Sequence, residues 1–105
     1  MSNGKLLIYS SQDSQRLNPI KSAVSKIAEP LKMQIQIIPM TDPFPTYVYY
    51  ENSDDPEKIP VYCDSQKTLG EREIYLSMRS ILFALSFHPK HSALLYARKE
   101  LLSPA

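Results

Sequence analysis

The sequence predicts one small α/β domain over residues 1–105, with its elements in the order β-α-β-β-β-α-α. Three observations support this fold class. The length suits a single hydrophobic core. Four short runs have the composition or alternation of strands, and three longer segments repeat apolar residues at helical spacing. We expect a mixed four-stranded sheet, because a βαβ unit makes a parallel pair and a later hairpin makes an antiparallel one.

The first half of the chain contains a strand, a helix and a second strand. Residues 5–9 form a short apolar run that is typical of a buried strand. Asn18 and Pro19 favour a helix start, since asparagine caps helices and proline is tolerated at the first helical position. Apolar residues then recur at helical spacing until Pro30, which should end or distort the helix. Residues 33–37 alternate between apolar side chains and glutamine, which predicts a strand.

The second half contains a hairpin followed by helices. Residues 46–50 are dense in β-branched and aromatic side chains, and residues 59–64 supply the returning strand. Pro60 cannot donate to a ladder, so this strand should lie at an edge or begin near Val61. Residues 68–71, Thr-Leu-Gly-Glu, match a capping box and predict a long apolar helix, and Pro89 opens a last one.

The apolar periodicity also predicts the core. The first helix should turn one apolar stripe towards the core, and the strands should contribute their apolar positions. The second helix is apolar almost all round, so it should be buried on more than one side. The residues expected to be buried together are Leu7, Val24, Ile27, Ile35, Ile37, Val48, Val61, Met78, Ile81, Leu82 and Leu85.

A proline precedes the predicted third strand, in Phe44-Pro45-Thr46. Together with the element order, this resembles the thioredoxin-like superfamily, whose members join a βαβ half to a ββα half and commonly place a proline there. The redox dithiol of that superfamily is absent, since Ser10-Ser11-Gln12-Asp13 follows the first strand. A short proline-containing loop replaces the usual helix before the third strand. A small analogue without a dithiol is the KaiB-like clock protein family in its thioredoxin-like state. The alternative fold is an α+β meander of the second, third and fourth strands, with helices on one face.

Glycine and cysteine usage excludes several kinds of site. Gly4 and Gly70 are the only glycines, whereas phosphate-binding loops and dinucleotide fingerprints need several at fixed spacing. The single cysteine, Cys63, excludes an intrachain disulfide, a Cys-x-x-Cys redox pair and a cysteine zinc cage. His88 and His91 lie in a predicted turn between helices, which is typical of surface histidines. We therefore expect no cofactor and no metal.

Charged residues are segregated along the chain. Residues 41–75 contain eight acidic and three basic residues, whereas residues 1–40 and 76–105 together contain nine basic and three acidic ones. The acidic middle of the chain disfavours nucleic-acid binding, and binding through the basic ends is a further functional alternative. No secretory signal is visible, and the longest apolar stretch, residues 81–87, is too short to span a bilayer. We expect a cytoplasmic protein that does not enter a membrane.

Tyrosines concentrate in the predicted hairpin, whose loop is acidic. Alternation puts Tyr47 and Tyr49 on one face of the sheet and Tyr50 on the other. Because tyrosine is enriched at interfaces, we predict a non-catalytic protein-interaction or regulatory module. It would dock a partner protein that carries basic residues, or self-associate through the edge strand. The predicted partner-binding residues are Phe44, Tyr47, Tyr49, Tyr50, Asp54, Asp55, Glu57 and Tyr62.

The alternative function is a small thiol-dependent enzyme or redox sensor centred on Cys63. If the thioredoxin-like order holds, its site would be lined by Tyr9, Ser10 and Ser11. A reactive cysteine needs a nearby cation or helix N-terminus, whereas the neighbouring Asp64 acts in the opposite direction. Alternation groups Cys63 with Ile59 and Val61, which favours a core position over a candidate reactive thiol.

Overall fold

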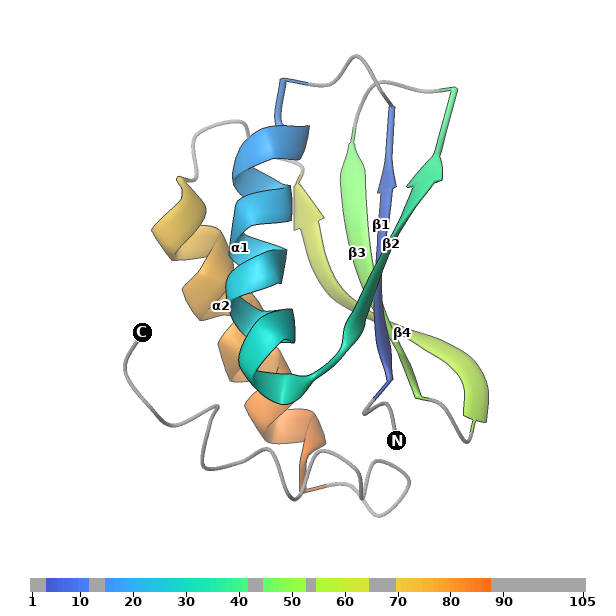
Figure 1. Cartoon of the computed structure of the whole chain (residues 1–105), viewed down its shortest axis with the longest axis vertical. Helices are drawn as coiled ribbons and strands as arrows, with labels where there is room; N and C mark the ends of the chain where they lie inside the picture. Colours follow the sequence, from blue (N-terminus) through green and yellow to red (C-terminus); the bar gives the residue numbers. More distant parts are fainter. Residues whose placement is uncertain (1–3, 12–14, 42–44, 53–54, 65–69, 88–105) are drawn as a thin grey trace.

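The computed structural model describes residues 4–11, 15–41, 45–52, 55–64 and 70–87. They form the elements β1 (Lys5–Ser10), α1 (Leu17–Leu31), β2 (Gln34–Pro39), β3 (Thr46–Asn52), β4 (Asp55–Asp64) and α2 (Glu71–Leu85) (Figure 1). The α/β class and the mixed four-stranded sheet are confirmed. The last predicted helix, after Pro89, lies outside the described residues. Neither described helix is long and apolar enough to cross a membrane.

The sheet has the strand order β2-β1-β3-β4. Strands β1 and β2 are parallel, whereas β3 is antiparallel to both β1 and β4. The alternative meander does not form, because β1 lies between β2 and β3. β4 is an edge strand, as Pro60 indicates, but it begins at Asp55 and includes that proline opposite Tyr49. β2 forms the other edge.

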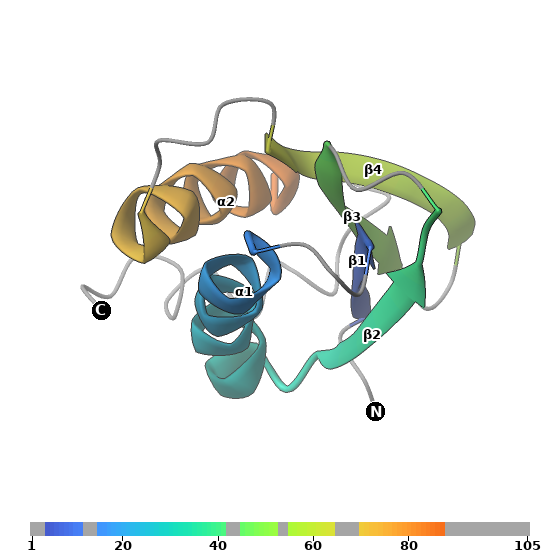
Figure 2. The ribbon, with the colours of Figure 1, turned by 90° about the horizontal axis from the view of Figure 1, so that it is seen from above.

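Both helices pack on the same side of the sheet (Figure 2). Between helices and sheet lies the core, where β1 contributes Leu6 and Ile8 and β3 contributes Val48 and Tyr50. Each helix turns one apolar stripe into the core, because one face of a helix is enough to cover a single sheet. The helix residues buried there are Ile20, Ala23, Val24, Ile27, Ala28 and Leu31 from α1, and Ile74, Tyr75, Met78 and Leu82 from α2.

The helix ends differ from the prediction. α1 begins at Leu17, and Arg16 rather than Asn18 is its N-cap residue. It continues through Pro30 and ends at Leu31. The next residue, Lys32, adopts the left-handed conformation with a φ of 57°. α2 begins at Glu71 with Gly70 as its N-cap, two residues later than a capping box at 68–71 would place it. Thr68 itself lies outside the described residues.

Five core predictions need correction. Ile37 and Ile81 are 38% and 37% exposed, because β2 is an edge strand and α2 turns only one stripe towards the sheet. Ile35 and Leu85 are partly buried at the margin of the core. Leu7 is buried as predicted, but it alternates with Leu6 and Ile8 and so lies on the opposite side of the sheet. The remaining predicted core residues, Val24, Ile27, Val48, Val61, Met78 and Leu82, are buried together.

Candidate binding surface

Three tyrosines cluster on the side of the sheet that faces away from both helices. The rings of Tyr9 and Tyr49 meet edge to face with centroids 5.3 Å apart, and the centroids of Tyr47 and Tyr49 are 6.4 Å apart. We call this surface, with the residues in register beside the three rings, the tyrosine face. Tyr9 comes from β1 and the other two from β3, which are the two central strands of the sheet. All three side chains are half-buried, and both described helices lie on the other side of the sheet (Figure 2).

The strand pleat explains why these rings share one side. Tyr9 alternates with Ile8 and Ser10, whose side chains turn towards the helices. Tyr9 lies opposite Tyr47 in the antiparallel pairing of β1 with β3, so the two side chains project from the same side. The cluster therefore follows directly from the register of the two central strands.

Lys58 of β4 extends across the tyrosine face. Its Nζ donates a hydrogen bond to the Tyr9 hydroxyl over 3.1 Å and lies 5.9 Å from the centroid of that ring. The hydrogen bond to Tyr9 raises the pKa of Lys58, so its ammonium stays charged. Lys58 is in register with Glu51 of β3, and Glu51 is in register with Lys5 of β1. One end of the tyrosine face thus carries a row of two cations with one carboxylate between them.

A register shift brings Cys63 to this surface. The β3–β4 pairing places Val48 opposite Tyr62 and Tyr49 opposite Pro60, so that Val61 is an extra residue in β4. Val61 and Tyr62 are both buried as a result, and Cys63 is exposed beside Tyr47. The predicted core position of Cys63 is wrong, because simple alternation takes no account of a one-residue bulge.

The predicted partner-binding residues separate into groups. Tyr47 and Tyr49 lie on the tyrosine face, whereas Tyr50 is fully buried and Tyr62 is 8% exposed, both on the helix side. Glu57 is exposed. Phe44 and Asp54 lie outside the described residues, and for Asp55 only the backbone, in β4, is described.

Tyr9 and Lys58 also belong to this surface, although the sequence pattern does not single them out. Residues 5–9 have the composition of one buried apolar run, but Lys5, Leu7 and Tyr9 share one phase of the alternation. The thiol-enzyme interpretation expects Tyr9 and Ser10 to lie together beside Cys63. The structure separates them, because the Ser10 hydroxyl lies 3.4 Å from the Thr46 hydroxyl on the helix side of the sheet.

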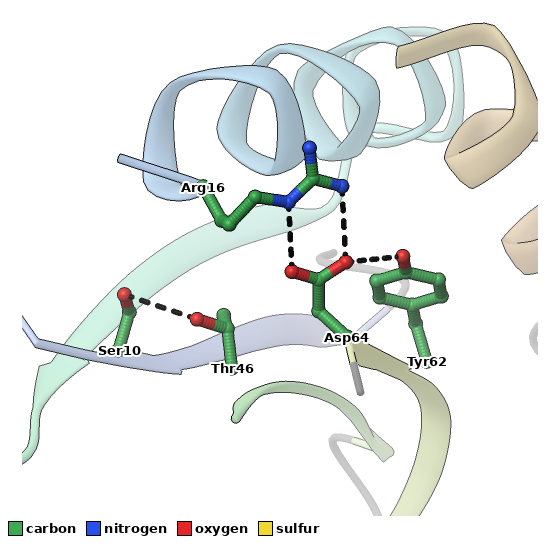
Figure 3. A network of polar contacts seen from close by, with 5 residues as sticks. All are labelled: Ser10, Arg16, Thr46, Tyr62 and Asp64. Carbon is green, nitrogen blue, oxygen red and sulfur yellow. Dashed lines mark hydrogen bonds and ion pairs between the residues drawn. The ribbon is translucent and has the colours of Figure 1, made fainter. Parts of the chain in front are cut away.

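A second polar cluster lies on the helix side, at the end of β4 (Figure 3). The Arg16 guanidinium donates to both carboxylate oxygens of Asp64, from Nε over 2.9 Å and from a terminal nitrogen over 3.1 Å. The Tyr62 hydroxyl donates to Asp64 over 2.6 Å. The Asp64 side chain is completely buried, and Arg16 is 18% exposed. The cluster therefore fastens the end of β4 to the start of α1.

Burial and hydrogen bonding set the ionisation of this cluster. Burial is the largest influence on Asp64 and acts to raise its pKa, but the hydrogen bonds from Arg16 and Tyr62 outweigh it and hold the pKa below its ordinary value. Burial, and then the hydrogen bond to Asp64, raise the pKa of Tyr62. Across the described residues, every buried side-chain nitrogen or oxygen has a hydrogen-bond partner. These groups are thus engaged with one another, and they act as internal supports.

The described residues contain no group of three histidine, cysteine, aspartate or glutamate side chains that could hold a metal ion. His88 and His91 lie outside the described residues. No protein-family model, curated protein or solved structure gives a significant match to the chain. We therefore infer function from the geometry of the tyrosine face.

Proposed function

We propose that the protein is a non-catalytic interaction module and that the tyrosine face is its docking surface. The observation that carries the proposal is the position of three half-buried tyrosines on the two central strands, with both helices on the other side of the sheet. Aromatic rings near the centre of a surface supply much of the binding energy in many complexes, since they bury large areas at low entropic cost. Tyr49 contacts both other rings and would be the central anchor.

The polar cluster on the other side of the sheet supports a non-catalytic role. The pKa values of Arg16, Tyr62 and Asp64 are all shifted from their ordinary values, and the three side chains hydrogen-bond to one another in the interior. Their contacts hold the end of β4 against the start of α1, which is a structural role. A docking surface benefits from a support that is already ordered, because ordering a surface on binding reduces the affinity.

The proposal includes a thioredoxin-like relationship without the redox dithiol. It is supported by the parallel β1–α1–β2 unit, the antiparallel β3–β4 hairpin and the position of Pro45 directly before β3. Fold alone does not determine function, so the docking proposal is independent of this relationship.

The sequence predicts a protein partner that carries basic residues, because the hairpin loop is acidic. The side chains of Asp54 and Asp55 are not described, and the tyrosine face itself carries Lys5 and Lys58 beside Glu51. Docking on the tyrosine face is thus a separate proposal from docking on the loop. Self-association through an edge strand is also a proposal, and it would leave the three tyrosines unchanged in exposure.

The docking proposal is tested by the native complex. The tagged chain is isolated from its host, and the co-isolated molecules are compared between the wild type and single alanine variants of Tyr47 and Tyr49. Loss of an anchor should weaken binding by about 2 kcal/mol or more. Exposed Lys21 on α1 gives the matched control, because Lys21→Ala alters the other side of the molecule. Equal retention by all variants with an intact fold would contradict docking on the tyrosine face.

A thiol-dependent function is the second candidate, and the exposure of Cys63 favours it. The residue in register with Cys63 is Tyr47, while its neighbours Tyr62 and Asp64 turn to the other side of the sheet. Insulin reduction or peroxide turnover that disappears in Cys63→Ser would support this candidate. Activity that persists without the cysteine would eliminate it.

A further inference from the structure

We infer that the tyrosine face binds single-stranded nucleic acid, with unpaired bases stacked on Tyr9, Tyr47 and Tyr49. This inference rests on the proposed docking function and names the class of its occupant. It departs from the protein partner and from the basic-end nucleic-acid site that the sequence predicted, because it uses the sheet. Protein docking on the same surface is the competing outcome.

The three tyrosine rings lie on adjacent central strands of the sheet. A four-stranded sheet with one uncovered side and aromatic residues on adjacent central strands can stack two or three unpaired bases. Here one ring comes from β1 and two come from alternate positions of β3, and neighbouring centroids lie 5.3 and 6.4 Å apart. Because every base has a π-face, such a surface is tolerant of sequence. Leu7 of β1 is buried on the same side of the sheet and is in register with Tyr49, so it adds apolar surface beside the rings.

The charged residues are distributed unequally between the two sides of the sheet. The acidic middle of the chain disfavours nucleic acid only if its carboxylates face the ligand. Asp64 is instead buried against Arg16, and Glu71 forms an ion pair with Lys26 on the helix side. The tyrosine face has Lys5 and Lys58 in one row with Glu51, so its described charged row is net cationic. That sign is complementary to a phosphate backbone.

Lys58 places a cation next to one of the aromatic rings. Its ammonium has three donors, and the Tyr9 hydroxyl accepts one of them. The hydrogen bond holds the cation beside the ring on which a base would stack. A phosphate next to that base would then lie within reach of a positioned, charged donor, which is the arrangement that single-strand binding requires.

The charged row of the tyrosine face has only two described cations, so binding should depend weakly on salt concentration. If Lys5 and Lys58 each contact one phosphate, the slope of log affinity against log salt concentration should be about −1.4 for a single strand. Most of the binding energy would then come from stacking. This differs from a protein that binds through a dense basic patch, for which the slope is several times steeper.

The experiment measures fluorescence anisotropy of labelled oligo(dT) and oligo(U), about eight nucleotides long, with the full-length chain at about 50 mM salt. The wild type should bind both strands and should not bind a duplex of the same length, since paired bases cannot stack on the rings. Tyr47→Ala and Tyr49→Ala should each weaken binding about 5- to 150-fold. The matched Tyr47→Phe and Tyr49→Phe variants keep the rings and should bind like the wild type. Phe87→Ala, at an exposed aromatic residue after α2, is the control for general loss of aromatic surface.

Charge variants keep the test informative if an alanine variant fails to fold. Lys58 is exposed, so Lys58→Glu should leave the fold intact, weaken binding and make the salt slope shallower by about 0.7. The protein has no tryptophan, so quenching of its tyrosine fluorescence would be an independent signal of stacking.

The outcomes separate the two proposals. Absence of oligonucleotide binding at low salt, or binding that is unchanged in both alanine variants and in Lys58→Glu, overturns the nucleic-acid inference. If a protein complex from the host still depends on Tyr47 and Tyr49, docking on the tyrosine face stands and its occupant is a protein. If neither ligand depends on these tyrosines, both proposals fail.

Discussion

Arg16 and Asp64 are 48 positions apart in the sequence, yet they form a bidentate ion pair whose carboxylate is completely buried. The pair joins the N-terminus of α1 to the C-terminal end of β4, and Tyr62 completes the hydrogen bonding of the carboxylate. Removing one partner of such a pair is costly, because it leaves the other charge without compensation in the interior.

Arg16→Ala should therefore destabilise the fold strongly. We expect a loss of about 3 kcal/mol, at the lower end of the range for buried pairs, because Arg16 is 18% exposed and water can partly replace it. The measurement is urea unfolding followed by circular dichroism at neutral pH. Lys26→Ala provides the matched control, because it breaks the more exposed Lys26–Glu71 pair and should cost less than about 1 kcal/mol. Similar losses of unfolding free energy in the two variants would show that the buried Arg16–Asp64 pair stabilises the fold no more than the exposed pair does.

The same carboxylate predicts a pH dependence. The pKa of Asp64 in the folded chain lies below its ordinary value of 3.8, chiefly because the hydrogen bonds from Arg16 and Tyr62 outweigh the effect of burial. The stabilisation is present above pH 3.8 and is lost as the pH falls through the lower folded value. Unfolding free energies measured from neutral pH to about pH 2.5 should fall more steeply for the wild type than for Asp64→Asn. Parallel curves for the two proteins would assign the acid sensitivity to other carboxylates.

Two adjacent residues of α2 should respond differently to truncation. Leu82 is fully buried in the core, whereas Ile81 is 37% exposed. Leu82→Ala should cost about 2–5 kcal/mol, since it removes transfer free energy and leaves a cavity. Ile81→Ala should cost about 1 kcal/mol or less, because surface substitutions have small effects. The free energy of unfolding of both variants tests the rotation of α2 about its axis, and the reverse ranking would show that the helix turns a different stripe towards the sheet.

Cys63 should react with a thiol reagent in the folded protein. Its exposure follows from the bulge at Val61, so one thiol per chain should be labelled before any unfolding transition. The check is the labelling rate at neutral pH with and without a low concentration of denaturant. Labelling that appears only on unfolding would contradict the β3–β4 register. Fast labelling alone would reflect exposure, so the thiol-enzyme alternative requires turnover that depends on Cys63.

The hairpin shows how far the sequence alone determines the site. Strand propensity and alternation correctly predicted that residues 46–50 form a strand and that Tyr47 and Tyr49 share one side. Pro60 correctly indicated an edge strand. These properties depend on neighbouring residues and on backbone chemistry, both of which are local.

The tertiary structure decided which side of the sheet the helices cover. Alternation divides β3 into two faces but does not say which is buried, and it is packing against α1 and α2 that buries Tyr50 and leaves Tyr49 half-exposed. One extra residue, Val61, reversed the expected orientation of Cys63, since the side-chain period of a strand is two. The contact of Tyr9 with Tyr49 and the pairing of Arg16 with Asp64 join distant segments. They arise only when the register of the whole sheet is set, and no local pattern encodes that register.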